Sequence, residues 1–222
     1  MLHVFRRITI TLVSQFQVVL YVIRRIYERF HYNDVTIAEE FRKQGAKVGK
    51  NCFIQIRKLG TEPYLVTIGD NVSIAHGVDL MTHDGASVIF RDELPSLRYF
   101  GRIVIEDNCF IGSDAIITAG VTIGKNSIIG PRAIVINDVK PGSIMMGNPA
   151  FRVSTAEKYK QKCLQEWERQ GLAKFESLFK GKDKFEVQQI MRSKAFRMQL
   201  QKHLESVDLL KPAHSEVTSI TK

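Results

Sequence analysis

Cysteine is scarce in this sequence: three residues occur among 222, at widely separated positions. An odd and scattered set argues against a disulfide framework, and no closely spaced pair offers the thiolates of a zinc site. Because free thiols persist in reducing compartments, the cysteines predict a cytoplasmic protein.

The sequence also lacks an uninterrupted apolar run of about 20 residues, the length needed to cross a bilayer. Its most apolar stretch, within residues 2–30, is interrupted by Ser14, Gln15 and Gln17 and flanked by pairs of arginines. No small-residue cleavage site follows, as a secretory signal peptide would require. We predict a helix here and leave two roles open: lying in the interface of an anionic membrane, or docking on a neighbouring subunit.

Acidic residues are outnumbered only at the two ends of the chain, which carries a net charge of +9. Residues 1–47 hold eight Lys or Arg against four Asp or Glu, and residues 154–222 hold fourteen against nine, whereas residues 48–153 hold ten of each. No aromatic platform or reading motif accompanies the basic residues, so nucleic acid is not an expected partner. Basic ends favour peripheral contact with an anionic membrane surface, or serve solubility alone.

What the sequence does have is a period of six. Branched aliphatic residues occupy six successive repeat positions, namely Ile105, Ile111, Ile117, Ile123, Ile129 and Val135. A second register four places later holds small or medium residues, namely Cys109, Ala115, Val121, Ser127, Ala133 and Val139. A period of six matches neither an α-helix nor a flat strand, but it fits a short strand and a turn repeated on each side of a coil. Each coil buries its apolar edge only against its neighbours, so the repeats must stack.

The repeat predicts the fold class, an all-β solenoid in the form of a parallel β-helix flanked by N- and C-terminal α-helices. The domains are expected to be residues 1–47, the coil at 48–153 and the helical residues 154–222. The period breaks at 57–67 and at about 85–102, and we expect an excursion at each break.

Helix signals lie outside the repeat. An amphipathic helix is expected at 34–46, where it covers the open end of the first coil. After the coil, Ser154 and Glu157 have the spacing of a capping box, which predicts a helix start. A second helix is expected at about 185–210, followed by a disordered tail.

His83 is the residue most suited to chemistry, because it lies where the period breaks before the longer excursion. Loops held by a rigid scaffold are the usual place for function, and a histidine takes up a proton near neutral pH. A histidine that only caps its loop is the alternative. Asp84 beside it has three possible roles: orienting the ring, binding a sugar hydroxyl or capping the turn. Arg91 in the excursion suits an acidic acceptor.

Residues 48–153 contain four motifs in a fixed order: Thr82-His83, the segments 105–112 and 118–124, and Gly147-Asn-Pro-Ala150. Through these motifs the region resembles the hexapeptide-repeat acetyltransferases, particularly those that modify sugars and polysaccharides. It implies a left-handed coil, a homotrimer with active sites between subunits, acetyl-CoA as acyl donor, and a sugar or glycan acceptor. No metal is expected.

The resemblance also assigns roles by position. It makes His83 the general base, which deprotonates the acceptor for direct attack on the thioester. The positions matched to the coenzyme are Phe110, Gly112, Ser113, Ala119, Pro131, Arg132, Asn137 and Lys140. Asn137 stands where a lysine is common, and Arg132 or Lys140 is then the candidate cation for the phosphates. The amide of Gly112, or another amide nearby, is a candidate donor to the thioester oxygen.

Two other functions compete with acetyl transfer. A zinc enzyme on the same solenoid needs three histidines, and only His76 and His83 occur in the repeat region. The protein could instead be a non-catalytic trimeric scaffold, but the position of His83 at the break would then be a coincidence. We therefore predict an acetyl-CoA-dependent transferase, on the cytoplasmic side of the membrane if its basic ends bind one.

Overall fold

The computed structural model describes residues 33–207 of the chain. The described chain divides into two compact units, one ending at Ala156 and the other beginning at Glu157. The helix expected within residues 2–30 and the tail beyond 207 lie outside the described residues. Within 33–207, no helix has both the length and the apolar character needed to cross a membrane.

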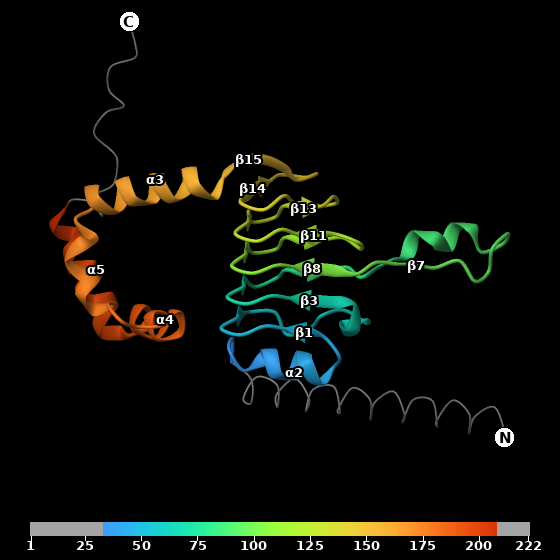
Figure 1. The fold of residues 1–222 in the computed structure, drawn as a ribbon, viewed down its shortest axis with the longest axis horizontal. Helices are drawn as coiled ribbons and strands as arrows, with labels where there is room; N and C mark the ends of the chain where they lie inside the picture. The colour runs from blue at the N-terminus through green and yellow to red at the C-terminus, as the bar shows by residue number, and fades with distance from the viewer. Residues whose placement is uncertain (1–32, 208–222) are drawn as a thin grey trace, which may run out of the picture. The chain divides into compact units, whose positions relative to one another are not determined.

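The coil of the first unit is built from three sheets of very short strands, stacked as successive turns (Figure 1). The first sheet contains β1 (Lys47–Val48), β3 (Val66–Ile68), β8 (Ile103–Ile105) and β11 (Thr122–Ile123). The second contains β2 (Phe53–Ile54), β4 (Ser73–Ile74), β9 (Phe110–Ile111), β12 (Ile128–Ile129), β14 (Ser143–Met146) and β15 (Phe151–Thr155). The third contains β5 (Asp79–Leu80), β10 (Ile116–Ile117) and β13 (Ile134–Val135).

Strand pairing in these sheets is parallel, except where β14 and β15 form an antiparallel pair. Ile123 pairs with Ile105, three hexapeptides earlier, so one coil consists of three repeats. The chain visits the first, second and third sheets in turn, and we call the turns between them the first, second and third corners. The third corner leads from the third sheet to the first sheet of the next coil.

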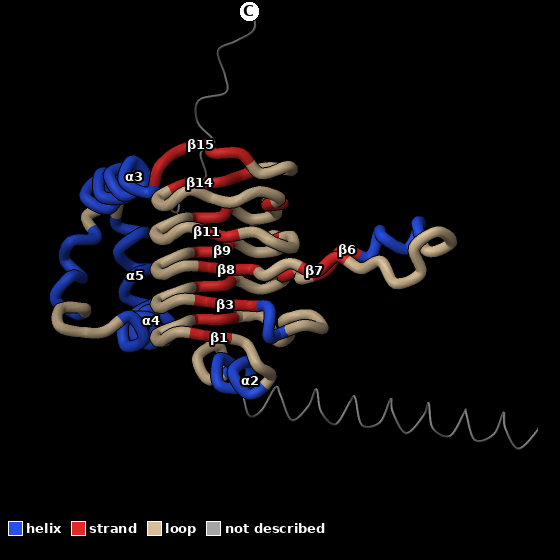
Figure 2. Tube along the Cα trace, turned by 45° about the vertical axis from the view of Figure 1, so that its right-hand side comes forward, coloured by secondary structure: helices blue, strands red, loops and turns tan. Residues whose placement is uncertain are grey.

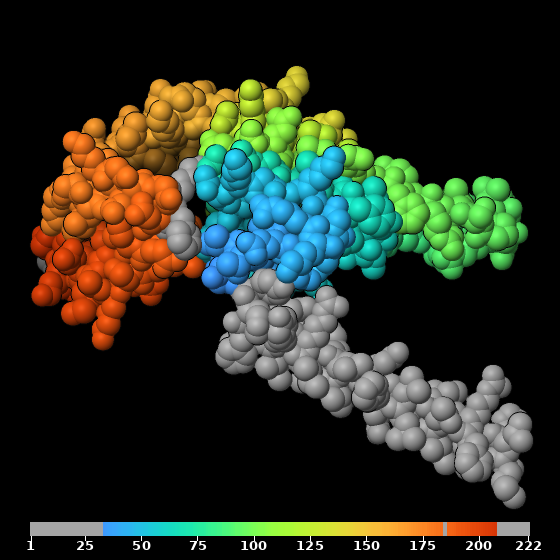
Figure 3. All heavy atoms as spheres, turned by 60° about the horizontal axis from the view of Figure 1, so that its bottom comes forward, coloured from blue at the N-terminus to red at the C-terminus, as the bar shows by residue number. Residues whose placement is uncertain are grey.

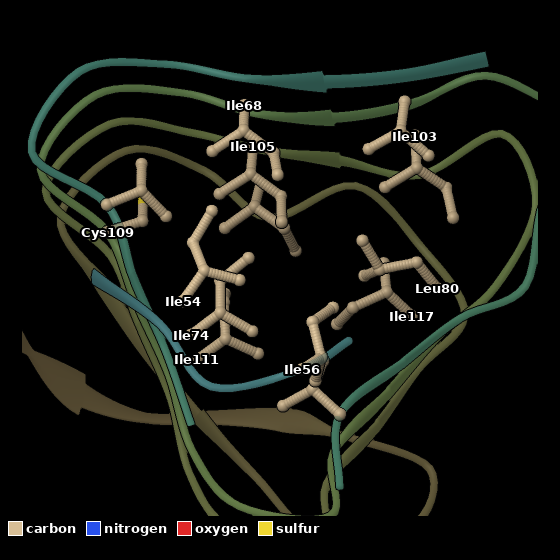
Figure 4. Close-up of a cluster of buried hydrophobic side chains, with 14 of the residues drawn as sticks. Ile54, Ile56, Ile68, Ile74, Leu80, Ile103, Ile105, Cys109, Ile111 and Ile117 are labelled. Atoms are coloured by element: carbon tan, nitrogen blue, oxygen red, sulfur yellow. The ribbon is translucent and has the colours of Figure 1, made fainter. Parts of the chain in front are cut away.

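The aliphatic register fills the interior. Its six members from Ile105 to Val135 are at most 1% exposed, and the six small residues four places later are buried beside them. Figure 4 shows side chains converging from three sides, among them Ile105, Ile111 and Ile117. Burial raises the pKa of the Cys109 thiol, which lies in this interior as a small packing residue. The predicted parallel coil is confirmed.

The first corner is held by a ladder of aspartates. Asp70 Oδ1 accepts the backbone N–H of Lys50, and Asp107 Oδ1 accepts that of Asp70, both at 2.7 Å. A Cβ on Gly69 would lie 2.3 Å from Asp107 Oδ1. Glycine is therefore required there, because each carboxylate occupies the space that a side chain of the preceding coil would fill.

The longer excursion is an arm, residues 83–100, that leaves the coil at the third corner (Figures 1 and 2). Its base is the antiparallel pair of β6 (His83–Asp84) and β7 (Tyr99–Phe100), and η2 (Gly85–Phe90) follows β6. The arm stands out from the coil surface in Figure 3. The shorter excursion contains η1 (Pro63–Leu65) and returns to the first sheet at Val66, earlier than the predicted 67.

Helix α2 (Ile37–Lys43) precedes the coil and is shorter than the predicted 34–46. The side chain of Asn33 accepts the N–H groups of Val35 and Thr36, which orders the turn before the helix. Ile37 and Phe41 are buried in the same core as the coil, and Gly45 has a φ of +97° just after the helix. The helix therefore covers the open end of the first coil, as predicted.

The C-terminal unit contains short helices: α3 (Ala156–Arg169), η3 (Leu172–Leu178), α4 (Lys184–Arg192) and α5 (Lys194–Ser206). The predicted capping box at Ser154 is wrong, because Ser154 lies in β15 and pairs with Ile144. The single helix predicted at about 185–210 is also wrong. It is divided at Ser193, whose side chain accepts the N–H of Phe196 and begins α5.

Candidate active site

His83 lies at the base of the arm, directly after the third sheet ends. The N–H of Met81 donates to the carbonyl of Ile117 in the next coil, and the N–H of Gly101 donates to the carbonyl of Thr82. The two strands at the arm base pair His83 with Phe100, and their rings lie 6.1 Å apart between centroids. The His83 side chain is 47% exposed, so a rigid backbone presents it to solvent.

The imidazole contacts a carboxylate from the shorter excursion. Glu62 Oε2 lies 2.9 Å from His83 Nδ1 and accepts the hydroxyl of Thr82 at 2.7 Å. Glu62 Oε1 accepts the hydroxyl of Thr61 at 2.6 Å. The Glu62 side chain is only 12% exposed. The two excursions, far apart in sequence, thus meet at His83.

These hydrogen bonds keep Glu62 ionised. The hydroxyls of Thr61 and Thr82 lower the pKa of Glu62 to about 2, from an ordinary value of 4.5, and His83 adds to the effect against the penalty of burial. A carboxylate that accepts several hydrogen bonds is stabilised in its charged form. Glu62 is therefore an anion throughout the range in which a histidine titrates.

The contact with Glu62 occupies one ring nitrogen of His83. Within residues 33–207, the other nitrogen, Nε2, has no hydrogen-bond partner. An imidazole held at Nδ1 and open at Nε2 has the arrangement of a general base, which needs one nitrogen within reach of a substrate hydroxyl.

The two predicted acceptor-binding residues lie on the arm. Asp84 Oδ1 accepts the N–H of Ala86 at 2.7 Å and caps η2, the turn-capping role among those considered for it. Arg91 directly follows η2 and is exposed. The hydrogen bond of Asp84 is thus made within the arm and not with His83. Binding of an acceptor by Asp84 and Arg91 stays a prediction.

Most positions predicted to contact the coenzyme lie at or before the second corner. The Arg132 N–H donates to the carbonyl of Ser113, so the turns of successive coils stack there. Phe110 in β9 is 46% exposed, and Pro131 is exposed. The Arg132 side chain is 85% exposed, with Asp114 at 3.9 Å. A cation at Arg132 is therefore available at this corner.

The remaining coenzyme positions lie elsewhere on the coil. Ala119 and Asn137 follow the strands of the third sheet and belong to the third corner with His83. The carbonyl of Lys140 accepts the hydroxyl of Ser127 at the first corner. A single copy of the chain therefore spreads the predicted coenzyme positions over three corners rather than gathering them around His83.

The proposed use of the Gly112 amide is wrong. That N–H donates to the carbonyl of Ile129 at 2.8 Å, within the hydrogen bonding between coils. A Cβ on Gly112 would lie 2.6 Å from the nitrogen of Pro131, so the glycine is needed for close stacking. Its amide is not available to an oxyanion.

Glu62 is the residue that the sequence prediction missed. It lies in an excursion where the period of six gives no information, and its partner His83 is 21 positions away. The available signal was limited to an acidic residue, followed by Pro63, in the break nearest to the one that carries His83.

Comparison with known proteins agrees with the repeat. The family model for bacterial transferase hexapeptide (six repeats) matches residues 102–137. Protein CapG of Staphylococcus aureus is 42% identical over 130 residues, which cover 57% of this chain and 76% of CapG. The galactoside O-acetyltransferase of Escherichia coli K12 is 38% identical over 102 residues, 46% of this chain and 50% of that protein.

Among solved structures, a galactoside acetyltransferase in complex with coenzyme A is similar, with a TM-score of 0.44 and 24% identity. The similarity covers 62% of this chain and 80% of that one. This chain thus spans most of CapG but about half of the E. coli enzyme. On the repeat, its coil and the match to CapG, the chain belongs to the hexapeptide-repeat acetyltransferases.

Proposed function

We propose that this protein transfers an acetyl group from acetyl-CoA to a hydroxyl group of a sugar or of a surface-polysaccharide precursor, with His83 as the general base. The observation that carries the proposal is the imidazole at the arm base, held at Nδ1 by Glu62 and open at Nε2. The names of relatives such as the galactoside O-acetyltransferase support a sugar as acceptor.

The reaction proceeds directly between the two bound substrates. His83 Nε2 takes the proton of the acceptor hydroxyl as its oxygen attacks the thioester carbonyl carbon. The carbon–sulfur bond then breaks, and the leaving thiolate takes the proton from Nε2–H. The products are an acetyl ester and free CoA, and His83 returns to its starting state without forming a covalent intermediate.

We further propose that the active site forms between copies of a homotrimer of left-handed coils, as the resemblance implies. The support from this chain is the distribution of its predicted coenzyme positions over three corners. We propose that the second corner of one copy faces the third corner of the next, so that the coenzyme positions of both corners line one cleft. Arg132 is then the candidate cation for the coenzyme phosphates, at the end of the coenzyme away from the thioester.

The test is a panel of sugar acceptors incubated with the full-length protein and acetyl-CoA. We expect acceptor-dependent release of CoA thiol, matched by a product that is heavier by one acetyl group. With acetyl-CoA alone, the mass of the protein should not change. CoA release that no acceptor accelerates, or an acetylated protein on the reaction path, would contradict the proposal.

Contact with an anionic membrane is a separate proposal and rests on the charge of the sequence ends. The full chain should sediment with anionic liposomes at low salt, and a chain beginning at Asn33 should not. Equal sedimentation of both proteins would remove the idea.

A further inference from the structure

The contact between the two excursions has a role of its own. We propose that Glu62 is the positioning residue of His83, fixing the ring tautomer that leaves Nε2 unprotonated, and that Thr82 holds Glu62 in place. This inference rests on the proposed function of His83 as base.

The Glu62 carboxylate is held in a fixed position. Both Glu62 oxygens accept hydrogen bonds, Oε1 from Thr61 and Oε2 from Thr82 and His83. Thr82 is 1% exposed, and its backbone carbonyl is bonded to Gly101, so its hydroxyl is a fixed donor. A carboxylate with three donors around it has little freedom to rotate.

The hydrogen between Glu62 and His83 belongs to the imidazole. An ionised carboxylate has no hydrogen to donate, so the hydrogen in the contact with His83 belongs to Nδ1. A neutral imidazole carries one ring hydrogen, and with this hydrogen on Nδ1 the lone pair is on Nε2. The charge of Glu62 therefore selects the tautomer that general-base catalysis requires.

The loop that carries Glu62 approaches the coil closely at a glycine. Gly60 has a φ of +80°, and a Cβ there would lie 3.4 Å from the carbonyl oxygen of Leu80 and 3.8 Å from Thr82 Oγ1. The shorter excursion thus packs closely against the end of β5, immediately before His83. Its path is set by this packing as well as by the hydrogen bonds of Glu62.

The experiment compares Glu62→Gln and Thr82→Val with Glu93→Gln, a matched control at an exposed carboxylate on the arm. The neutral amide in Glu62→Gln accepts or donates, so it no longer selects one tautomer. We expect kcat to fall about 10- to 100-fold, the loss typical when the carboxylate that orients a metal-bound histidine is removed. The KM for acetyl-CoA should not change. Thr82→Val, which keeps the shape of the side chain, should lower kcat less than Glu62→Gln does. Glu93→Gln should leave kcat unchanged.

A second readout does not depend on activity. In protein labelled with ¹⁵N-histidine, the imidazole shifts distinguish the two ring nitrogens, and His83→Gln identifies the signals of His83 among the six histidines. At alkaline pH we expect the Nδ1–H tautomer in the wild type and a mixture in Glu62→Gln. A purely structural role for Glu62 would alter the melting temperature and leave the tautomer unchanged.

The outcomes separate this inference from the proposed function. Unchanged tautomer and unchanged kcat in Glu62→Gln would overturn the positioning role while leaving His83 as base. If His83→Gln retained full activity, the proposed function would fail whatever the tautomer.

Discussion

The coil contains two kinds of turn that differ in what their side chains do. The regular turns lie at 103–139, and the interrupted turns carry Glu62 and His83. In the regular turns, aliphatic side chains are fully buried and corner carboxylates satisfy backbone amides. In the interrupted turns, two chain segments leave the coil and bring an ionised carboxylate to a half-exposed histidine. The repeat supplies a rigid frame, and the breaks in it hold the residues of the proposed active site.

This difference separates stability from activity. A change in a regular turn removes packing that every neighbouring coil depends on, whereas a change at the interrupted turn removes polar groups at the edge of the frame. Variants in the regular turns should therefore lower mainly the stability, whereas variants at the interrupted turn should lower the activity and, to a smaller extent, the stability. The following predictions test that division.

The largest stability effect is expected for Ile129→Ala in the coil interior. Ile129 is 0% exposed, and truncating a buried isoleucine costs about 2–5 kcal/mol through lost burial and a residual cavity. The matched control is Ile89→Ala on the arm, where the side chain is 73% exposed and little should change. Denaturant unfolding measures both. Equal losses in the two variants would contradict the division between frame and arm.

A smaller effect is expected for Glu62→Gln, because the lost acceptor is charged and hydrogen bonds to charged groups contribute about 1.5–3 kcal/mol. Folding lowers the pKa of Glu62 from 4.5 to about 2, so the folded state binds this proton less readily than the unfolded chain. The stabilisation is therefore complete above pH 4.5 and is lost as the pH falls through about 2.

Thermal unfolding as a function of pH checks this sign. The difference in melting temperature between wild type and Glu62→Gln should be constant above pH 4.5 and shrink in acid. A difference that grows on acidification would show that Glu62 is not held as an anion.

The smallest effect is expected outside the coil, in the C-terminal unit. The Asp183 side chain accepts the N–H of Glu186, and the Glu186 side chain accepts that of Asp183, which forms a capping box at the start of α4. Asp183→Ala should cost about 1 kcal/mol of stability. Acetyl transfer by the folded protein should not change, and a drop in kcat would link this unit to the active site.

The sequence predicts the coil well, because an aliphatic residue at every sixth position specifies stacked repeats. Local helix or strand propensity does not produce such a pattern. It predicts the C-terminal helices less well. Ser154 has the spacing of a cap but pairs in β15, and Ser193 divides a pattern that is apolar enough for one helix. In both places a single contact that the sequence pattern does not specify decides where a helix begins.

For the site, the position of His83 was predictable from the broken period, whereas its partner was not. The meeting of Glu62 with His83 depends on the path of an excursion that has no repeat to fix it. The prediction for the Gly112 amide failed for the opposite reason. The regular stacking of the coils itself gives this N–H a partner, the carbonyl of Ile129.

The most direct test of the account is the rate of acetyl transfer by His83→Ala, with Ile89→Ala as the control. Because general bases contribute about 10²- to 10⁴-fold, we expect kcat/KM for the acceptor to fall by at least about 100-fold in a protein that melts like the wild type. A loss of less than about tenfold would mean that another group takes the proton, and His83 would not be the base.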